Sequence, residues 1–192
     1  MQRLRSLLRT AAPAIAVLVL VPSATASSWD WDTSLADYES RMESAVSPSS
    51  RFAWLDSAAF SAVMAGNLEK AKGYADEALM LAPSFRNEWS YGNAIHHGHL
   101  VLGHLALLDG DVKTAEKELL TAGKIDGSPQ LDTFGPNMAL AKALLEKGRR
   151  EVVLAYFEEC RKFWGDYLHE LDTWKAAVEK GEIPDFGPNL LY

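Results

Sequence analysis

The spacing of apolar residues is the feature that most constrains the fold of this 192-residue chain. From Phe52 onward they recur every three or four positions, as on one face of an amphipathic helix. No Asn-Gly or Asp-Gly pair joins two alternating apolar runs, where a hairpin of strands would place it. Glycine and proline interrupt the pattern at Gly66, Pro83, Gly110, Gly127, Pro129, Gly135, Pro136, Gly148 and Gly165. The sequence therefore predicts an all-α fold built from helices of about 10–15 residues.

A short motif recurs within this helical region. Its clearest copy has the pair Leu102-Gly103, the turn Gly110-Asp111, and the stripe Ala-x-x-x-Leu-x-x-Ala over residues 115–122. Two further copies are centred on the turn glycines Gly66 and Gly148. The small residues of the motif allow two helices to approach closely, and the larger apolar residues fill the space between successive copies. The pattern therefore predicts a series of helical hairpins.

This motif resembles the tetratricopeptide repeat (TPR), a pair of helices joined by a Gly-Asp or Gly-Asn turn. The resemblance implies an all-α, right-handed α-solenoid of about three TPR-like helical hairpins with terminal capping helices. The hairpins would occupy about residues 51–84, 96–127 and 134–165. Residues 27–50 would hold an N-terminal segment and capping helix, and residues 166–192 a C-terminal capping helix and tail. About three repeats are needed because one repeat cannot bury its own apolar face.

The first 26 residues have the three-part layout of a cleavable secretory signal peptide. Three arginines come first, then the apolar run 14–21, and then the small residues 23–26 that signal peptidase accepts. The apolar run is much shorter than the about 20 residues that span a bilayer as a helix. We therefore expect cleavage after Ala26 and a periplasmic or secreted protein that is not integral to a membrane. An uncleaved anchor and an organelle transit peptide are the alternatives.

Charge and motif content exclude several function classes. The chain has 26 acidic and 19 basic residues, and its formal net charge of −7 argues against non-specific nucleic-acid binding. The one cysteine, Cys160, excludes a disulfide framework within the chain, and we expect it to be a packed thiol. We find no glycine-rich phosphate loop and no Gly-x-Ser-x-Gly elbow. The sequence therefore predicts no enzyme activity and no cofactor.

Four histidines, His96, His97, His99 and His104, crowd one predicted helix. Imidazole is a common zinc, copper and nickel ligand, so the alternative function is a small metal-binding protein or metal-dependent enzyme centred on these four residues. Their spacing gives pairs at i,i+3 and i,i+7, but no i,i+4 pair and no His-Glu-x-x-His motif. His96 and His97 are adjacent and cannot share a helix face. Packed or groove-lining histidines are the favoured interpretation.

The TPR resemblance also implies a concave surface formed by the first helix of each hairpin. Such surfaces bind peptides and proteins, so we expect an exported, non-catalytic module with a peptide or protein partner. Acidic, aromatic and imidazole groups in one groove would suit a basic or apolar segment. The positions that the resemblance places in this groove are Asp56, Phe60, His97, His104, Leu107, Met138 and Lys142.

The tetrad Phe-Gly-Pro-Asn occurs twice, at residues 134–137 and again at 186–189, close to the chain end. The two copies could form matching surface turns that hold a partner. The tail could instead fold back and pack through its apolar residues. We favour packing, because an apolar chain end outside the core would form an exposed patch.

Overall fold

The computed structural model describes residues 29–165 and 169–191, and it contains no strand within those ranges. The all-α prediction is therefore confirmed, while the expected signal peptide at residues 1–26 lies outside the described residues. The elements are α1 (Trp31–Glu43), α2 (Pro48–Met64), α3 (Leu68–Leu81), η1 (Ala82–Phe85), α4 (Tyr91–Leu108), α5 (Val112–Gly123), α6 (Pro129–Phe134), α7 (Ala139–Glu146), α8 (Arg150–Cys160), α9 (Glu170–Glu179) and η2 (Gly187–Leu190). None of the α-helices in this part of the chain is long and apolar enough to cross a membrane.

In three pairs of helices, α2–α3, α4–α5 and α7–α8, the same glycine turn joins the two members of the pair. In the second pair the Gly110 N–H donates to the Leu107 carbonyl and the Asp111 N–H donates to the Ala106 carbonyl. These two bonds form a Schellman motif, which requires a left-handed residue after the helix. Gly110 has a φ of +83°, a conformation that costs glycine no steric penalty. The local sequence therefore ends one helix and reverses the chain direction.

The residue after the glycine then begins the next helix. The Asp111 carboxylate accepts the Thr114 N–H at 3.0 Å, and the Asn67 side chain accepts the Lys70 N–H in the first pair. Both contacts are N-caps, which satisfy backbone donors that the helix itself leaves unpaired. In these two turns a glycine thus ends one helix, and the short polar residue after it begins the next.

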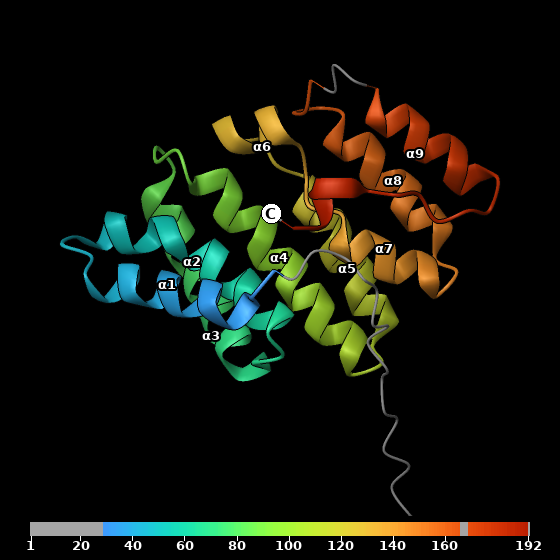
Figure 1. Cartoon of the computed structure of the whole chain (residues 1–192). Helices are drawn as coiled ribbons and strands as arrows, with labels where there is room; N and C mark the ends of the chain where they lie inside the picture. Colours follow the sequence, from blue (N-terminus) through green and yellow to red (C-terminus); the bar gives the residue numbers. More distant parts are fainter. Residues whose placement is uncertain (1–28, 166–168, 192) are drawn as a thin grey trace, which may run out of the picture.

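Helix α4 runs through the middle of the molecule, with α1–α3 on one side, α5 and α7–α9 on the other, and α6 above it (Figure 1). Glycines let it approach neighbours on both sides. A Cβ atom on Gly98 would lie 2.8 Å from Leu79 of α3, and one on Gly103 would lie 2.3 Å from Leu140 of α7. Both distances are shorter than a carbon–carbon contact allows. The packing of both halves against α4 therefore depends on these small positions.

The two halves have cores of different composition. In the N-terminal half six alanines of α2 and α3 are fully buried: Ala58, Ala59, Ala62, Ala71, Ala75 and Ala78. The core of the C-terminal half also has fully buried alanines, and it adds large aromatic side chains to them: Tyr156, Phe157, Trp164, Trp174 and Phe186. Cys160 is buried within this second core, as predicted, and burial raises the pKa of its thiol well above the ordinary value.

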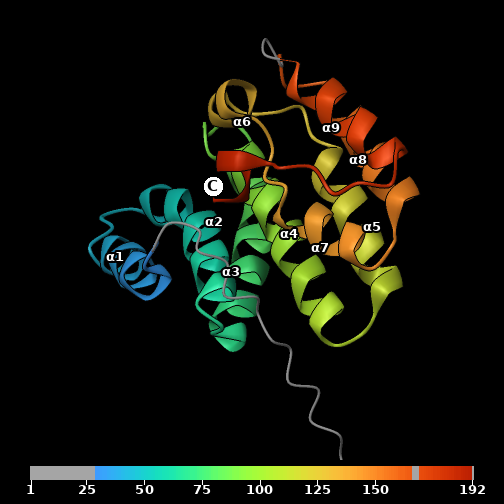
Figure 2. The same cartoon turned by 45° about the vertical axis from the view of Figure 1, so that its right-hand side comes forward.

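The chain end folds back onto the molecule beside α6 and α7, and the two tetrads contact each other (Figure 2). The Asn189 amide donates to the carbonyls of Phe134 and Pro136 at 3.1 and 3.0 Å. The Met138 N–H donates in return to the Asn189 carbonyl at 2.7 Å. Phe186 is only 1% exposed and packs edge-on against Trp174. The packing interpretation of the repeated tetrad is confirmed.

Candidate functional site

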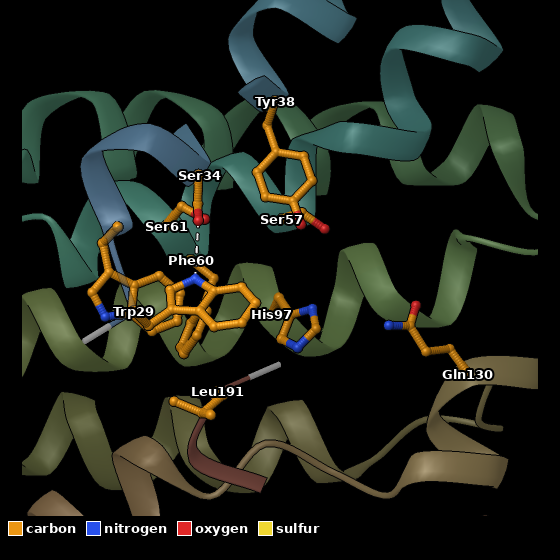
Figure 3. A pocket seen from close by; sticks show the side chains of 10 residues that line it. Trp29, Ser34, Tyr38, Ser57, Phe60, Ser61, His97, Gln130 and Leu191 are labelled. Atoms are coloured by element: carbon orange, nitrogen blue, oxygen red, sulfur yellow. Dashed lines mark hydrogen bonds between the residues drawn. The ribbon is translucent and has the colours of Figure 1, made fainter. Parts of the chain in front are cut away.

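A cavity of about 270 Å³ opens between α1, α2 and α4 (Figure 3). Both ends of the described chain contribute to its walls, with Trp29 at the N-terminal side and Leu191 at the C-terminal side. Four of the ten lining residues are aromatic, and none is lysine, arginine, aspartate or glutamate. The full lining is Trp29, Trp31, Ser34, Tyr38, Ser57, Phe60, Ser61, His97, Gln130 and Leu191.

Helix α2 supplies three lining residues because of its periodicity. Ser57, Phe60 and Ser61 are three and four residues apart, so they lie on one helix face. The start of this helix is fixed by a capping box, in which Ser47 and Ser50 exchange side-chain and backbone hydrogen bonds. The face carries two hydroxyl groups beside one aromatic ring.

A buried Asp–His pair lies at the wall of the cavity. His97 and Asp56 are 5% and 3% exposed, and the His97 Nδ1 lies 3.1 Å from the Asp56 Oδ2. An ionised carboxylate only accepts hydrogen bonds, so Nδ1 carries the proton and donates it. The other ring nitrogen, Nε2, is buried and has no hydrogen-bond partner in the structure. Buried polar atoms are almost always paired, so this unpaired nitrogen is a candidate contact for water or a ligand.

Aromatic rings connect the opening of the cavity with this pair. Trp29 is half exposed, and its indole N–H donates to the Ser34 hydroxyl at 2.9 Å. Its ring lies 5.9 Å from that of Trp31, which meets the Phe60 ring edge-on at 5.6 Å. Phe60 in turn lies 5.9 Å from the His97 ring. Aromatic rings therefore follow one another along the cavity wall from Trp29 to His97.

The structure brings together three of the predicted groove residues. Asp56 and His97 are hydrogen-bonded, and Phe60 lies beside them in the cavity wall. Figure 3 also shows the amide end of Gln130 pointing toward His97. The Gln130 carbonyl oxygen accepts from the Asn93 amide at 2.5 Å, which fixes the orientation of that side chain. Phe60 and His97 therefore line one cavity, and Asp56 is hydrogen-bonded to His97.

The other four predicted residues do not line this cavity. Met138 was expected to face a partner, but it is fully buried and bonded to Asn189, because the chain end covers it. Leu107 packs against the C-terminal core, and Lys142 lies half buried on α7. The Nε2 of His104 is buried without a partner, and burial lowers the pKa of this histidine to about 4.

The four histidines do not converge on one point. The His96 Nδ1 lies 2.9 Å from the Ala122 carbonyl, and its Nε2 accepts the Asn137 N–H at 3.1 Å. Both of its nitrogens are therefore occupied, and burial lowers its pKa to about 3. His99 instead pairs with Glu118 of α5 at 2.7 Å. Residues 29–165 and 169–191 hold no group of three or more His, Cys, Asp or Glu side chains arranged to bind a metal.

Sequence reasoning missed most of the cavity wall. The sequence places Trp29 and Trp31 in an N-terminal segment and Leu191 in a packed tail, and all three line the cavity. One signal was available, since Ser57 and Ser61 have the same four-residue spacing as Asp56 and Phe60. No local pattern could show that the two chain ends meet at this place.

Comparison with protein-family models, with curated proteins and with solved structures gives no match to this chain.

Proposed function

We propose that this chain is an exported TPR-like interaction module that binds a peptide or protein partner without catalysis. The binding site is the cavity between α1, α2 and α4. The observation that carries the proposal is the buried, unpaired Nε2 of His97 at the wall of a cavity with aromatic lining. A bound partner would supply the hydrogen bond that this nitrogen lacks.

The TPR-like part of the proposal is supported by the glycine turns. Gly66, Gly110 and Gly148 have φ angles of +78°, +83° and +74°, and each closes a pair of consecutive helices. Fully buried alanines and the helical Gly103 bring helices close together, as the repeat requires. We propose that these pairs follow one another as a right-handed solenoid, with α1 and α9 as capping helices.

Binding is favoured over catalysis by the surroundings of His97. A serine nucleophile would need its hydroxyl within hydrogen-bond reach of the base. None of Ser34, Ser57 and Ser61 is in reach, because Nε2 has no hydrogen-bond partner. A metal centre is not favoured either, because His96 uses both ring nitrogens to bind backbone groups. The cavity therefore offers recognition groups and no assembled reaction machinery.

Site-specific photo-crosslinking tests the proposal. Tyr38 lines the cavity and is only partly buried, so the aromatic photoreactive residue p-benzoylphenylalanine replaces it with little change in shape. The same residue at Met80, which is 70% exposed on α3 and outside the cavity, is the matched control. The experiment uses cells that express the tagged protein, with irradiation before lysis.

We expect one crosslinked partner from position 38 and none of that mass from position 80. Phe60→Leu should weaken this crosslink several-fold while leaving the helical content unchanged. The proposal is wrong if position 38 yields no crosslink, or if both positions capture the same proteins equally.

A further inference from the structure

We infer that the cavity binds a basic side chain, lysine or arginine, of the partner. This inference rests on the proposed function and adds the chemistry of the group that enters. Three features of the cavity carry it: the charge of the Asp56–His97 pair, the aromatic lining, and the hydrogen-bonding state of the His97 Nε2.

The charge of the pair favours a cation. With its carboxylate ionised, the pair of Asp56 and His97 carries −1 when the imidazole is neutral and 0 when it is protonated, so it is never positive. No lysine or arginine lines the cavity to compensate for an anionic ligand. A carboxylate or phosphate would therefore meet no opposite charge, whereas an ammonium or guanidinium group would lie near a buried carboxylate.

The aromatic lining favours the same class of ligand. Trp29, Trp31, Tyr38 and Phe60 together line the cavity. Aromatic faces attract lysine and arginine side chains through the ring quadrupole, most strongly when the cation is desolvated, and tryptophan is the best of the three ring types. A basic side chain also has an apolar stem, which suits the half-exposed ring of Trp29 at the opening.

The unpaired nitrogen supplies the directional contact. When the ring is neutral, donation of the His97 Nδ1 proton to Asp56 leaves a lone pair at Nε2, which is buried and has no partner in the structure. A lysine ammonium or an arginine guanidinium has only N–H donors, which match this acceptor. The volume of about 270 Å³ lies just below the about 300–1,000 Å³ of sites for drug-sized ligands, so it suits one side chain.

Capped amino acids test the inference directly. The probes are N-acetyl-lysine amide and N-acetyl-arginine amide, compared with the neutral N-acetyl-norleucine amide and the acidic N-acetyl-glutamate amide. NMR follows the shift of the Trp29 indole N–H during titration, because this group is hydrogen-bonded to Ser34 at the cavity. We expect the two basic probes to bind about tenfold more tightly than the neutral and acidic ones.

Two variants separate charge from shape. Asp56→Asn keeps an oxygen acceptor for His97 but removes the negative charge, so it should weaken the lysine probe about tenfold and leave the norleucine probe unchanged. If Asp56→Asn does not fold, Trp29→Ala serves as the test variant, because it removes only an exposed ring. The Tyr38 resonances then report probe binding in place of the Trp29 indole. Trp89→Ala is its matched control, since Trp89 is 52% exposed and lies outside this cavity.

The outcomes distinguish the inference from the proposed function. Equal or tighter binding of the norleucine or glutamate probe overturns the inference, and so does the absence of binding by every probe. In either case a partner crosslinked at position 38 would keep the proposed function. If position 38 yields no crosslink but the lysine probe binds selectively, the proposed function is wrong, whereas the inferred cation site is supported.

Discussion

His96 and His97 are neighbours on α4, yet they lie in regions of opposite character. The His96 ring lies in a closed junction between α4, the end of α5 and the first Phe-Gly-Pro-Asn tetrad, where both of its nitrogens are bonded. The His97 ring faces Asp56 and the cavity, where one nitrogen has no partner. Their rings are only 5.2 Å apart. The comparison shows that the groups surrounding a histidine, and not its sequence context, decide which hydrogen bonds its ring makes.

The junction is closed because each polar group at its centre is paired. The Asn137 carbonyl accepts the Tyr156 hydroxyl at 2.9 Å, and the Asn137 side-chain oxygen accepts the Ala139 N–H. Asn189 of the second tetrad then bonds to the carbonyls on either side of Gly135. The junction therefore connects α4, α7, α8 and the chain end through paired polar groups.

The largest effect in this comparison is expected at His96. His96→Ala removes a fully buried ring and leaves the Ala122 carbonyl and the Asn137 N–H without partners. Lost packing together with two unsatisfied backbone groups should lower the free energy of unfolding by about 3–5 kcal/mol. Urea denaturation followed by circular dichroism measures this change.

The control for this substitution is His169→Asn. The His169 side chain is 79% exposed, and its φ of +58° is a conformation that asparagine adopts readily. We expect less than about 0.5 kcal/mol of change there. A loss below about 1 kcal/mol for His96→Ala would show that the junction does not depend on this ring.

A smaller effect is expected in the pH dependence of stability. Burial lowers the pKa of His96 in the folded protein to about 3, whereas the unfolded chain titrates near 6.5. The unfolded state therefore binds more protons below about pH 6.5, and the stabilisation present above that pH is lost as the pH falls toward 3. From pH 6.5 to 4.5, His96 alone should account for a loss of about 2 kcal/mol in the free energy of unfolding.

His96→Gln isolates this contribution, because glutamine keeps a donor and an acceptor but does not titrate. His104, whose pKa is lowered to about 4, remains in both proteins and cancels in the difference. The variant should lose about 2 kcal/mol less than the unaltered chain between the two pH values. Identical losses in urea denaturation would show that His96 does not titrate as a buried neutral ring.

The sequence predicted the features that depend on local interactions. The turn at Gly110 and Asp111 is fixed by a few adjacent residues, so its position and its helix ends could be predicted. Asp56 and Phe60 share a helix face by spacing alone, and the resemblance assigned His97 to the same groove. In the structure both residues contact His97.

The features that the sequence did not predict depend on contacts between residues far apart along the chain. Met138 is covered because Asn189 bonds to it from more than fifty residues away along the chain. The cavity wall likewise combines Trp29 with Leu191, near the two ends of the described residues. The repeated tetrad predicted a packed tail, but not that each copy packs against the other.

The smallest effect on stability is expected at the opening of the cavity. Trp29 is 54% exposed, and its one hydrogen bond joins it to the partly exposed Ser34. Trp29→Ala should therefore change the free energy of unfolding by no more than about 0.5 kcal/mol. Urea denaturation beside Trp89→Ala, a tryptophan of nearly equal exposure, measures this change against a matched control. If Trp29→Ala alone lowers the free energy of unfolding by more than about 2 kcal/mol, this ring is needed to pack α1 against the rest of the molecule. The distinction between a junction that stabilises the fold and a cavity that binds a ligand would then be wrong.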